Sequence, residues 1–137
     1  KTALNMYDSK PLFGVGPKLF RVMCNDKLYA INDISCSTHP HNNYIQALAE
    51  TGLIGFLFIM ILFLYVSLNI LQHIKGIVSI KKYIKNDLEI CMLICFFINL
   101  WPIIPTLNLF NNWINILYFM PVGFYLHSMS LNIKETK

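Results

Sequence analysis

The clearest pattern along the chain is the change from a polar first part to long apolar runs. Residues 52–71 carry no charged side chain, and about 20 apolar residues are needed to cross the hydrocarbon core of a bilayer. Residues 90–126 are also free of formal charge, but this run is too long for one crossing. It divides at the polar residues 106–112. The pattern therefore predicts three transmembrane helices, at about residues 52–71, 88–105 and 113–131.

Prolines interrupt the later apolar runs. A proline inside a helix removes one backbone donor and clashes with the preceding turn. We therefore expect Pro102 and Pro105 to bend or end the second span, and Pro121 to kink the third. Residues 132–137 follow as a short tail.

The first 51 residues are mixed in polarity and rich in turn formers. Because glycine permits positive φ and proline fixes φ, residues 8–11 and 14–17 are expected to form turns. A short helix is expected to end with residues 4–7, before the first turn. Residues 18–37 have poor periodicity, which predicts an ordered loop with one helical turn at residues 19–24.

A well-marked helix start follows this loop. Ser37 or Thr38 is a candidate cap, and Asn42 or Asn43 offers a second cap position. Apolar side chains then recur at helical spacing, which predicts a short amphipathic helix that runs to about Gly52.

Composition and charge place this pattern in a membrane. Hydrophobic residues make up 55% of the chain and charged ones 13%, with a mean hydropathy of +0.51, which predicts an all-α integral membrane protein rather than a soluble domain. Much of the net charge of +4 lies in residues 72–87. Short lysine-rich loops stay in the cytoplasm, so this loop and the tail are expected inside. Residues 106–112 and the first 51 residues are then outside, and no nucleic-acid partner is indicated.

The N-terminal residues have neither a basic stretch followed by an apolar core nor an initiator methionine. The first point argues against a signal peptide. The second leads us to expect that the chain is the C-terminal piece of a longer membrane protein.

The four cysteines fall into two pairs with different surroundings. Cys24 and Cys36 lie in the polar part, where an oxidising compartment would allow a disulfide that stabilises the fold by about 3 kcal/mol. Two unpaired thiols are the alternative. Cys91 and Cys95 are one helical turn apart in an apolar run, and we expect them to be small packing residues.

Two motifs in the polar part carry a family resemblance. His41 and Asn42 are followed after nine residues by Gly52 and then by Gly55, the pattern H-N-x9-G-x-x-G. Upstream, residues 11–16 form P-x-x-G-x-G with Gly14 and Gly16. Together these motifs resemble the O-antigen ligase and polymerase family of bacterial envelope enzymes.

The resemblance implies glycan transfer at the periplasmic face of the bacterial inner membrane, in a multi-pass protein with a large periplasmic loop. The donor is a glycan on undecaprenyl diphosphate. The acceptor is a lipid A-core hydroxyl in the ligases and another lipid-linked repeat unit in the polymerases, and the sequence does not separate the two. No metal or cofactor is implied. We expect the 137-residue chain to be inactive alone, because three spans cannot enclose two lipid-linked substrates.

Residues 39–55, called the histidine stretch below, suit this chemistry. A histidine with an ordinary pKa of about 6.5 can take the proton of an acceptor hydroxyl, which makes His41 the candidate catalytic base. The diphosphate needs positive charge and N–H donors. A helix that starts near Asn42 would offer free amides, and Arg21 would add a guanidinium. The apolar span after Gly52 would receive the lipid tail.

Each of these residues also has an ordinary structural interpretation. His41 could cap or pack in a loop, Arg21 could form a surface salt bridge, and Asn42 could simply cap the helix. His39 is more readily a structural or substrate-edge residue than a second base. Tyr44 could stack on a sugar or anchor the chain at the membrane interface.

Three further expectations follow from the same stretch. His39 and His41 form an H-x-H pair, but no cysteine or carboxylate cluster completes a metal site, so no metal is expected. Gly52 and Gly55 are expected to permit close approach of helices, and Glu50 to be a solvated charge.

A non-enzymatic scaffold or transporter subunit remains a competing class of protein, although a transporter would carry ionisable groups in its spans.

Overall fold

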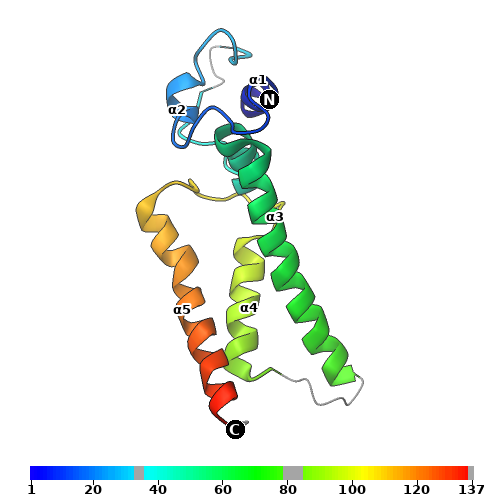
Figure 1. Cartoon of the computed structure of the whole chain (residues 1–137). Helices are drawn as coiled ribbons and strands as arrows, with labels where there is room; N and C mark the ends of the chain where they lie inside the picture. The colour runs from blue at the N-terminus through cyan, green and yellow to red at the C-terminus, as the bar shows by residue number, and fades with distance from the viewer. Residues whose placement is uncertain (33–35, 79–84, 136–137) are drawn as a thin grey trace. The chain divides into compact units, whose positions relative to one another are not determined.

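In this computed structural model, residues 1–32, 36–78 and 85–135 are described (Figure 1). Within these ranges the regular structure is entirely helical, as the sequence predicts. The elements are α1 (Thr2–Ser9), α2 (Phe20–Met23), α3 (Asn43–Val78), α4 (Asp87–Asn99) and α5 (Asn112–Glu135). The short helix before the first turn and the helical turn within residues 19–24 are thus confirmed as α1 and α2.

The three long helices differ in their fitness to cross a membrane. α3 has 36 residues and is the one helix of the described chain that is both long and apolar enough. α4 has 13 residues, a rise of about 20 Å, and α5 has 24. The structure thus supports a helical protein with one candidate spanning helix, and three spans remain a prediction.

An asparagine side chain marks the start of each long helix. Asn42 Oδ1 accepts from the backbone N–H groups that open α3. Asn86 Oδ1 accepts from Glu89 N at 2.7 Å in α4, and Asn111 Oδ1 from Trp113 N at 3.1 Å in α5. Asparagine is among the best N-caps because its side chain satisfies amides that the first turn leaves unpaired.

The prolines affect the two later helices differently. α4 ends at Asn99, before Pro102 and Pro105, so both prolines lie in the connection to α5 and not in a helix. Pro121 lies inside α5, which continues through it.

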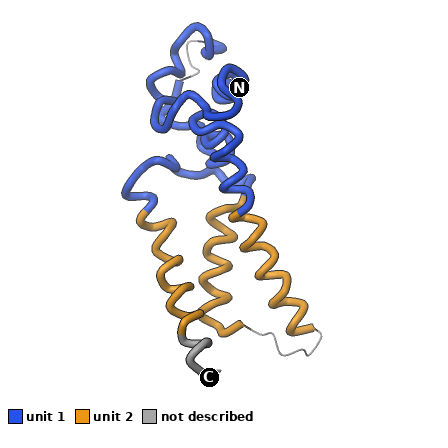
Figure 2. Tube along the Cα trace, in the orientation of Figure 1, with its two compact units in different colours: residues 1–61, 102–115 blue, residues 62–101, 116–137 orange. Residues whose placement is uncertain are grey.

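Contacts divide the chain into two compact units (Figure 2). Unit 1 comprises residues 1–61 and 102–115, and unit 2 comprises residues 62–101 and 116–137. The histidine stretch and the α4–α5 connection therefore belong to the same unit, although about 60 residues separate them in sequence.

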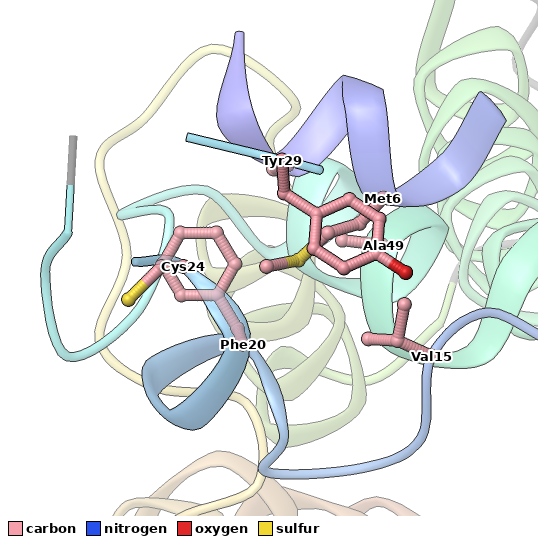
Figure 3. Close-up of a cluster of buried hydrophobic side chains, with 7 residues drawn as sticks. Met6, Val15, Phe20, Cys24, Tyr29 and Ala49 are labelled. Carbon is pink, nitrogen blue, oxygen red and sulfur yellow. The ribbon is translucent and has the colours of Figure 1, made fainter. Parts of the chain in front are cut away.

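The core of unit 1 joins α1, α2 and the first part of α3 (Figure 3). Its buried members are Ala3, Met6, Val15, Phe20, Cys24, Tyr29 and Ala49. Cys24 is bonded to Cys36 in a disulfide, which confirms the first of the two alternatives for this pair. The bridge links the loop after α2 to this small apolar core, which also contains Ala49 of the histidine stretch.

Unit 2 has a smaller core of Val66, Leu93 and Tyr125, one residue from each of α3, α4 and α5. The rings of Phe63 and Phe97 stack beside it with centroids 5.6 Å apart. Many large apolar side chains of these helices are exposed, among them Leu64, Leu68, Ile98, Ile116, Leu117 and Phe124.

Two cysteines of unit 2 differ from expectation. Cys91 and Cys95 are exposed free thiols in the described chain, so the prediction that they pack is wrong here. Their neighbour Leu93 is 1% exposed and occupies the packed side of α4 instead.

Candidate active site around His41

The glycine-rich segment 11–16 lies against the first part of α3. Val15 N donates to Ala49 O at 2.9 Å, and Gly16 N donates to Glu50 O at 2.9 Å. In an unbroken helix these two carbonyls would accept from the N–H groups four residues later. The segment therefore replaces a pair of helical hydrogen bonds.

The two backbone N–H groups that lose their helical acceptors in this way donate to carbonyls of the same segment. Leu53 N donates to Pro11 O at 2.8 Å, and Ile54 N contacts Leu12 O at 3.5 Å. Between the two sets lies Gly52, whose φ of 67° and ψ of −161° break the helical path. The chain thus passes from a short first helix into the apolar helix without losing its backbone hydrogen bonds, at the residue where the sequence predicts the change.

Only glycine fits the two contact points. Gly14 has φ +66°, and a Cβ there would collide with the backbone of Glu50. A Cβ at Gly52 would collide with the backbone of Leu12, and its φ and ψ fall in a region that is essentially restricted to glycine. The expectation of close helix approach is therefore wrong at Gly52, which admits the backbone of a loop.

The last glycine of the motif serves a local purpose. A Cβ at Gly55 would overlap the side chain of Thr51, one turn earlier in the same helix. Thr51 Oγ1 donates to Ala47 O at 2.8 Å, so Gly55 leaves room for this bonded side chain and not for a second helix.

His41 is exposed and is held by its backbone. Its φ is +57°, a left-handed conformation that is uncommon for residues other than glycine, although asparagine, aspartate and histidine adopt it more often than the rest. Its carbonyl accepts from Thr106 N at 2.9 Å, and its ring centroid lies 4.2 Å from that of His39. In the part of the chain that the structure describes, the ring nitrogens of His41 have no hydrogen-bond partner and are available to a substrate.

His39 is buried and fully bonded. Its Nδ1 lies 2.9 Å from Thr38 Oγ1, and its Nε2 lies 3.3 Å from Thr106 O. Because a carbonyl can only accept, the network assigns the proton to Nε2 and leaves Nδ1 to accept from the hydroxyl. Burial, and then the adjacent His41, lower the pKa of His39, while the Thr106 carbonyl and Glu50 oppose this shift. His39 is therefore a neutral structural histidine.

Asn42 uses both ends of its side chain within the protein. Its Oδ1 accepts from Tyr44 N at 3.0 Å and from Ile45 N at 3.1 Å, and its Nδ2 donates to Pro102 O at 2.7 Å. The capping interpretation of Asn42 is thus confirmed. The expected free amides at this helix start are wrong for Tyr44 and Ile45, since Asn42 already satisfies them.

Tyr44 is buried, and its ring meets that of Phe56 edge to face with centroids 6.0 Å apart. Stacking on a sugar requires an open ring face, so packing is the role that the geometry supports.

Glu50 is not a solvated charge. It is 1% exposed, and its two oxygens accept from Phe20 N at 2.8 Å and from Gln46 Nε2 at 2.9 Å. Gln46, also 1% exposed, extends this network because its Nε2 donates to Asn108 Oδ1 at 2.8 Å and its Oε1 accepts from Leu109 N at 3.0 Å.

Sequence reasoning missed Gln46 altogether. The available signal was its spacing of four residues from Glu50, which puts the two side chains on one helix face. The spacing gives no sign of the third partner, because Asn108 lies 62 residues away.

Arg21 is exposed on α2 and forms no ion pair within the described chain. No contact joins it to His41 among those residues, so the structure does not bring together the two side chains assigned to base and diphosphate. Among the same residues, no group of three or more His, Cys, Asp or Glu side chains is placed to hold a metal ion.

Comparison with known protein families gives a match over the first part of the chain. Residues 1–60 match the model of the family described as O-Antigen ligase, which confirms the resemblance carried by the two glycine motifs and His41. No curated protein and no solved structure matches the chain. The matched residues end inside α3, so the α4–α5 connection lies outside them.

Proposed function

Because residues 1–60 match the O-antigen ligase family, we propose that the protein transfers a glycan from undecaprenyl diphosphate to an acceptor hydroxyl, with His41 as the general base. The single observation that carries this role is the state of His41. Its backbone is fixed in an uncommon conformation, while the nitrogens of its exposed ring form no hydrogen bond within the described chain. A residue that served only packing would have its ring buried or bonded, as His39 has.

The proposed step balances with one proton transfer. The acceptor O–H gives its proton to a ring nitrogen of His41, and the oxygen forms a bond to the anomeric carbon of the donor sugar. The bond from that carbon to the diphosphate breaks, and undecaprenyl diphosphate leaves with the bonding electrons. A positioned histidine base typically contributes about 10²–10⁴-fold to such a step.

A neutral His39 favours the uptake of a proton by the neighbouring His41. Two cations about 4 Å apart repel by about 4 kcal/mol at an effective dielectric constant of 20. The lowered pKa of His39 favours its neutral form, which lessens this repulsion when His41, at a centroid distance of 4.2 Å, takes up a proton.

Arg21 is the proposed contact for the diphosphate. Its guanidinium is exposed and has no ion pair in the described chain, and arginine binds phosphate oxygens bidentately. An Arg21→Lys substitution should then retain charge but lose the two-point contact, which raises the KM for the donor more than it lowers kcat. An unchanged KM would remove Arg21 from the site.

The proposed location is the inner membrane, with the histidine stretch on the periplasmic face. Support comes from the hydrogen bonds between the α4–α5 connection and residues 39–46 at the start of α3. If α3 crosses the bilayer once, the chain must cross back before Pro102 to form them. This supports three spans as predicted at 52–71, 88–105 and 113–131, except that the second crossing would end before Pro102 and would use α4 with the residues directly after Asn99.

The acceptor that we propose is the lipid A-core, as in the ligases. The decisive experiment is His41→Ala in the complete protein in its bacterial membrane, with the envelope glycans analysed by gel and mass spectrometry. We expect transfer to stop and lipid-linked donor to accumulate. Loss of glycan on the lipid A-core while polymer is still made would identify a ligase, and loss of long chains would identify a polymerase.

The matched control is His127→Ala, which removes another exposed histidine, on α5. It should leave the glycan profile as in the wild type. An unchanged profile in His41→Ala, at equal protein level, would refute the role of His41.

A further inference from the structure

Besides the Pro102 carbonyl, which accepts from Asn42 Nδ2, the α4–α5 connection contacts the histidine stretch at two further places. The first is Thr106, whose N–H donates to His41 O and whose carbonyl accepts from His39 Nε2. The second is the pair Asn108 and Leu109, which binds the two ends of the Gln46 side chain. Segment 102–109 therefore follows the stretch from before His41 to one turn inside α3.

These contacts act on the backbone that sets the direction of the His41 ring. A left-handed residue other than glycine costs about 1–2 kcal/mol and persists only where neighbours hold it. Thr106 N–H bonds to the carbonyl of that residue, and Asn42, the next residue, donates its Nδ2 to Pro102 O at 2.7 Å. Segment 102–109 thus holds both the carbonyl of His41 and the side chain of the residue that follows it.

Thr106 also acts on the neighbouring ring. Its carbonyl holds the Nε2 proton of His39, whose ring lies beside that of His41. A shift of this one residue would therefore move the His41 backbone and the ring that flanks it together.

We propose that segment 102–109, which lies outside the family match, is a working part of the site and that Thr106 is the positioning residue for His41. Gln46 and Asn108 form the second anchor that keeps the segment in place. This inference rests on the proposed function of His41, and its tests are chosen so that the two can fail separately.

A matched pair of substitutions at Thr106 isolates the backbone contact. Thr106→Pro removes the N–H that bonds to His41 and keeps the carbonyl that bonds to His39. Thr106→Ala keeps both backbone groups and removes only the side chain, whose buried Oγ1 has no partner in the described chain. In the complete protein in membranes, we expect Thr106→Pro to lower kcat about 10-fold or more, with the KM for the lipid-linked donor unchanged. The loss of kcat in Thr106→Ala should be clearly smaller than in Thr106→Pro, because both backbone hydrogen bonds remain.

A second pair keeps the test decisive if Thr106→Pro does not accumulate in the membrane. Asn108→Leu removes the oxygen that accepts from Gln46, and Asn108→Asp retains an acceptor there. We expect Asn108→Leu to lower kcat about three- to tenfold, with recovery in Asn108→Asp. Equal kcat in Asn108→Leu and the wild type would overturn the inference.

Hydrogen–deuterium exchange of the peptide that covers residues 39–46 gives a readout independent of transfer. Exchange should be faster in Thr106→Pro and Asn108→Leu and unchanged in the two control variants. Faster exchange with normal kcat would overturn the positioning role, because the contact would then hold the loop without serving the reaction. Failure of the proposed function has a separate signature, which is normal transfer by His41→Ala.

Discussion

The two compact units of this chain differ in the contacts that most distinguish them. Unit 1 joins its parts through backbone contacts at glycines and through buried polar side chains such as Glu50 and Gln46. Unit 2 has a small apolar core and long helices whose large side chains are mostly exposed, as in Leu64 and Ile116. Hydrogen bonds depend on position to within a few tenths of an ångström, whereas apolar helix faces tolerate changes of side chain.

This difference suggests how the two units divide their tasks. The site proposed around His41 needs fixed geometry, and unit 1 contains contacts that only certain residues can make. A helix in lipid needs length and hydrophobicity, which many sequences provide. We therefore expect equivalent substitutions to be costly in unit 1 and mild in unit 2.

The largest contrast is expected between two glycines. Gly52→Ala places a Cβ on the Leu12 backbone in a glycine-only conformation, and we expect a loss of about 4 kcal/mol or more, with the protein absent from the membrane. At Gly123 in α5 an added Cβ meets nothing within 4 Å of the described chain, so Gly123→Ala should stabilise by up to about 1 kcal/mol. Protein level and thermal unfolding in detergent measure both. Similar behaviour of the two variants would remove the contrast between the units.

The disulfide gives the next largest effect. Reduction of Cys24–Cys36, or the double substitution to serine, should cost about 3 kcal/mol because the bridge closes a loop of 12 residues in unit 1. Cys91→Ser and Cys95→Ser change exposed thiols of unit 2 and should leave the unfolding temperature unchanged. A reductant that lowers stability equally in the double serine variant would act on something other than this bridge.

The structural features that the sequence predicted correctly depend on residues close together in the chain. The helix break at Gly52, the cap at Asn42 and the helical turn α2 each depend on a few neighbouring residues, and each has a recognisable signature. The histidine motif likewise lies within one stretch. These features could be predicted without knowing how the chain folds back on itself.

What the sequence could not predict depends on contacts between distant residues. Glu50 has the pattern of a surface charge, but the docking of α2 buries it by bringing Phe20 N to its carboxylate. Thr106 and Asn108 lie in residues 106–112, for which the sequence predicts only an uncharged loop on the outer side of the membrane. Their partners His41 and Gln46 are more than 60 residues away, and no local pattern reports such pairing.

The buried carboxylate gives a test of intermediate size. Glu50→Leu removes the acceptor of Phe20 N and one of the two acceptors of Gln46 Nε2, which should cost about 1–3 kcal/mol. Glu50→Gln retains one oxygen and should cost less. Thermal unfolding in detergent measures both, with Leu64→Ala at an exposed position of α3 as the comparison from unit 2. If Glu50→Leu is as stable as the wild type, the polar network does not hold unit 1 together.

The smallest expected effect concerns the response of unit 1 to pH. Because burial, and then His41, lower the pKa of His39 from its usual 6.5, the unfolded chain binds a proton below that pH that the folded chain does not. Stability should therefore fall as the pH drops below about 6.5 and stay level above it. Unfolding temperatures at pH 7.5 and 5.5 should differ more in the wild type than in His39→Gln, whose amide can donate to the same Thr106 carbonyl without titrating. His127→Gln, from the exposed surface of unit 2, should retain the wild-type difference in unfolding temperature. An equal response to pH in all three proteins would show that the lowered pKa of His39 does not contribute to the pH dependence of stability.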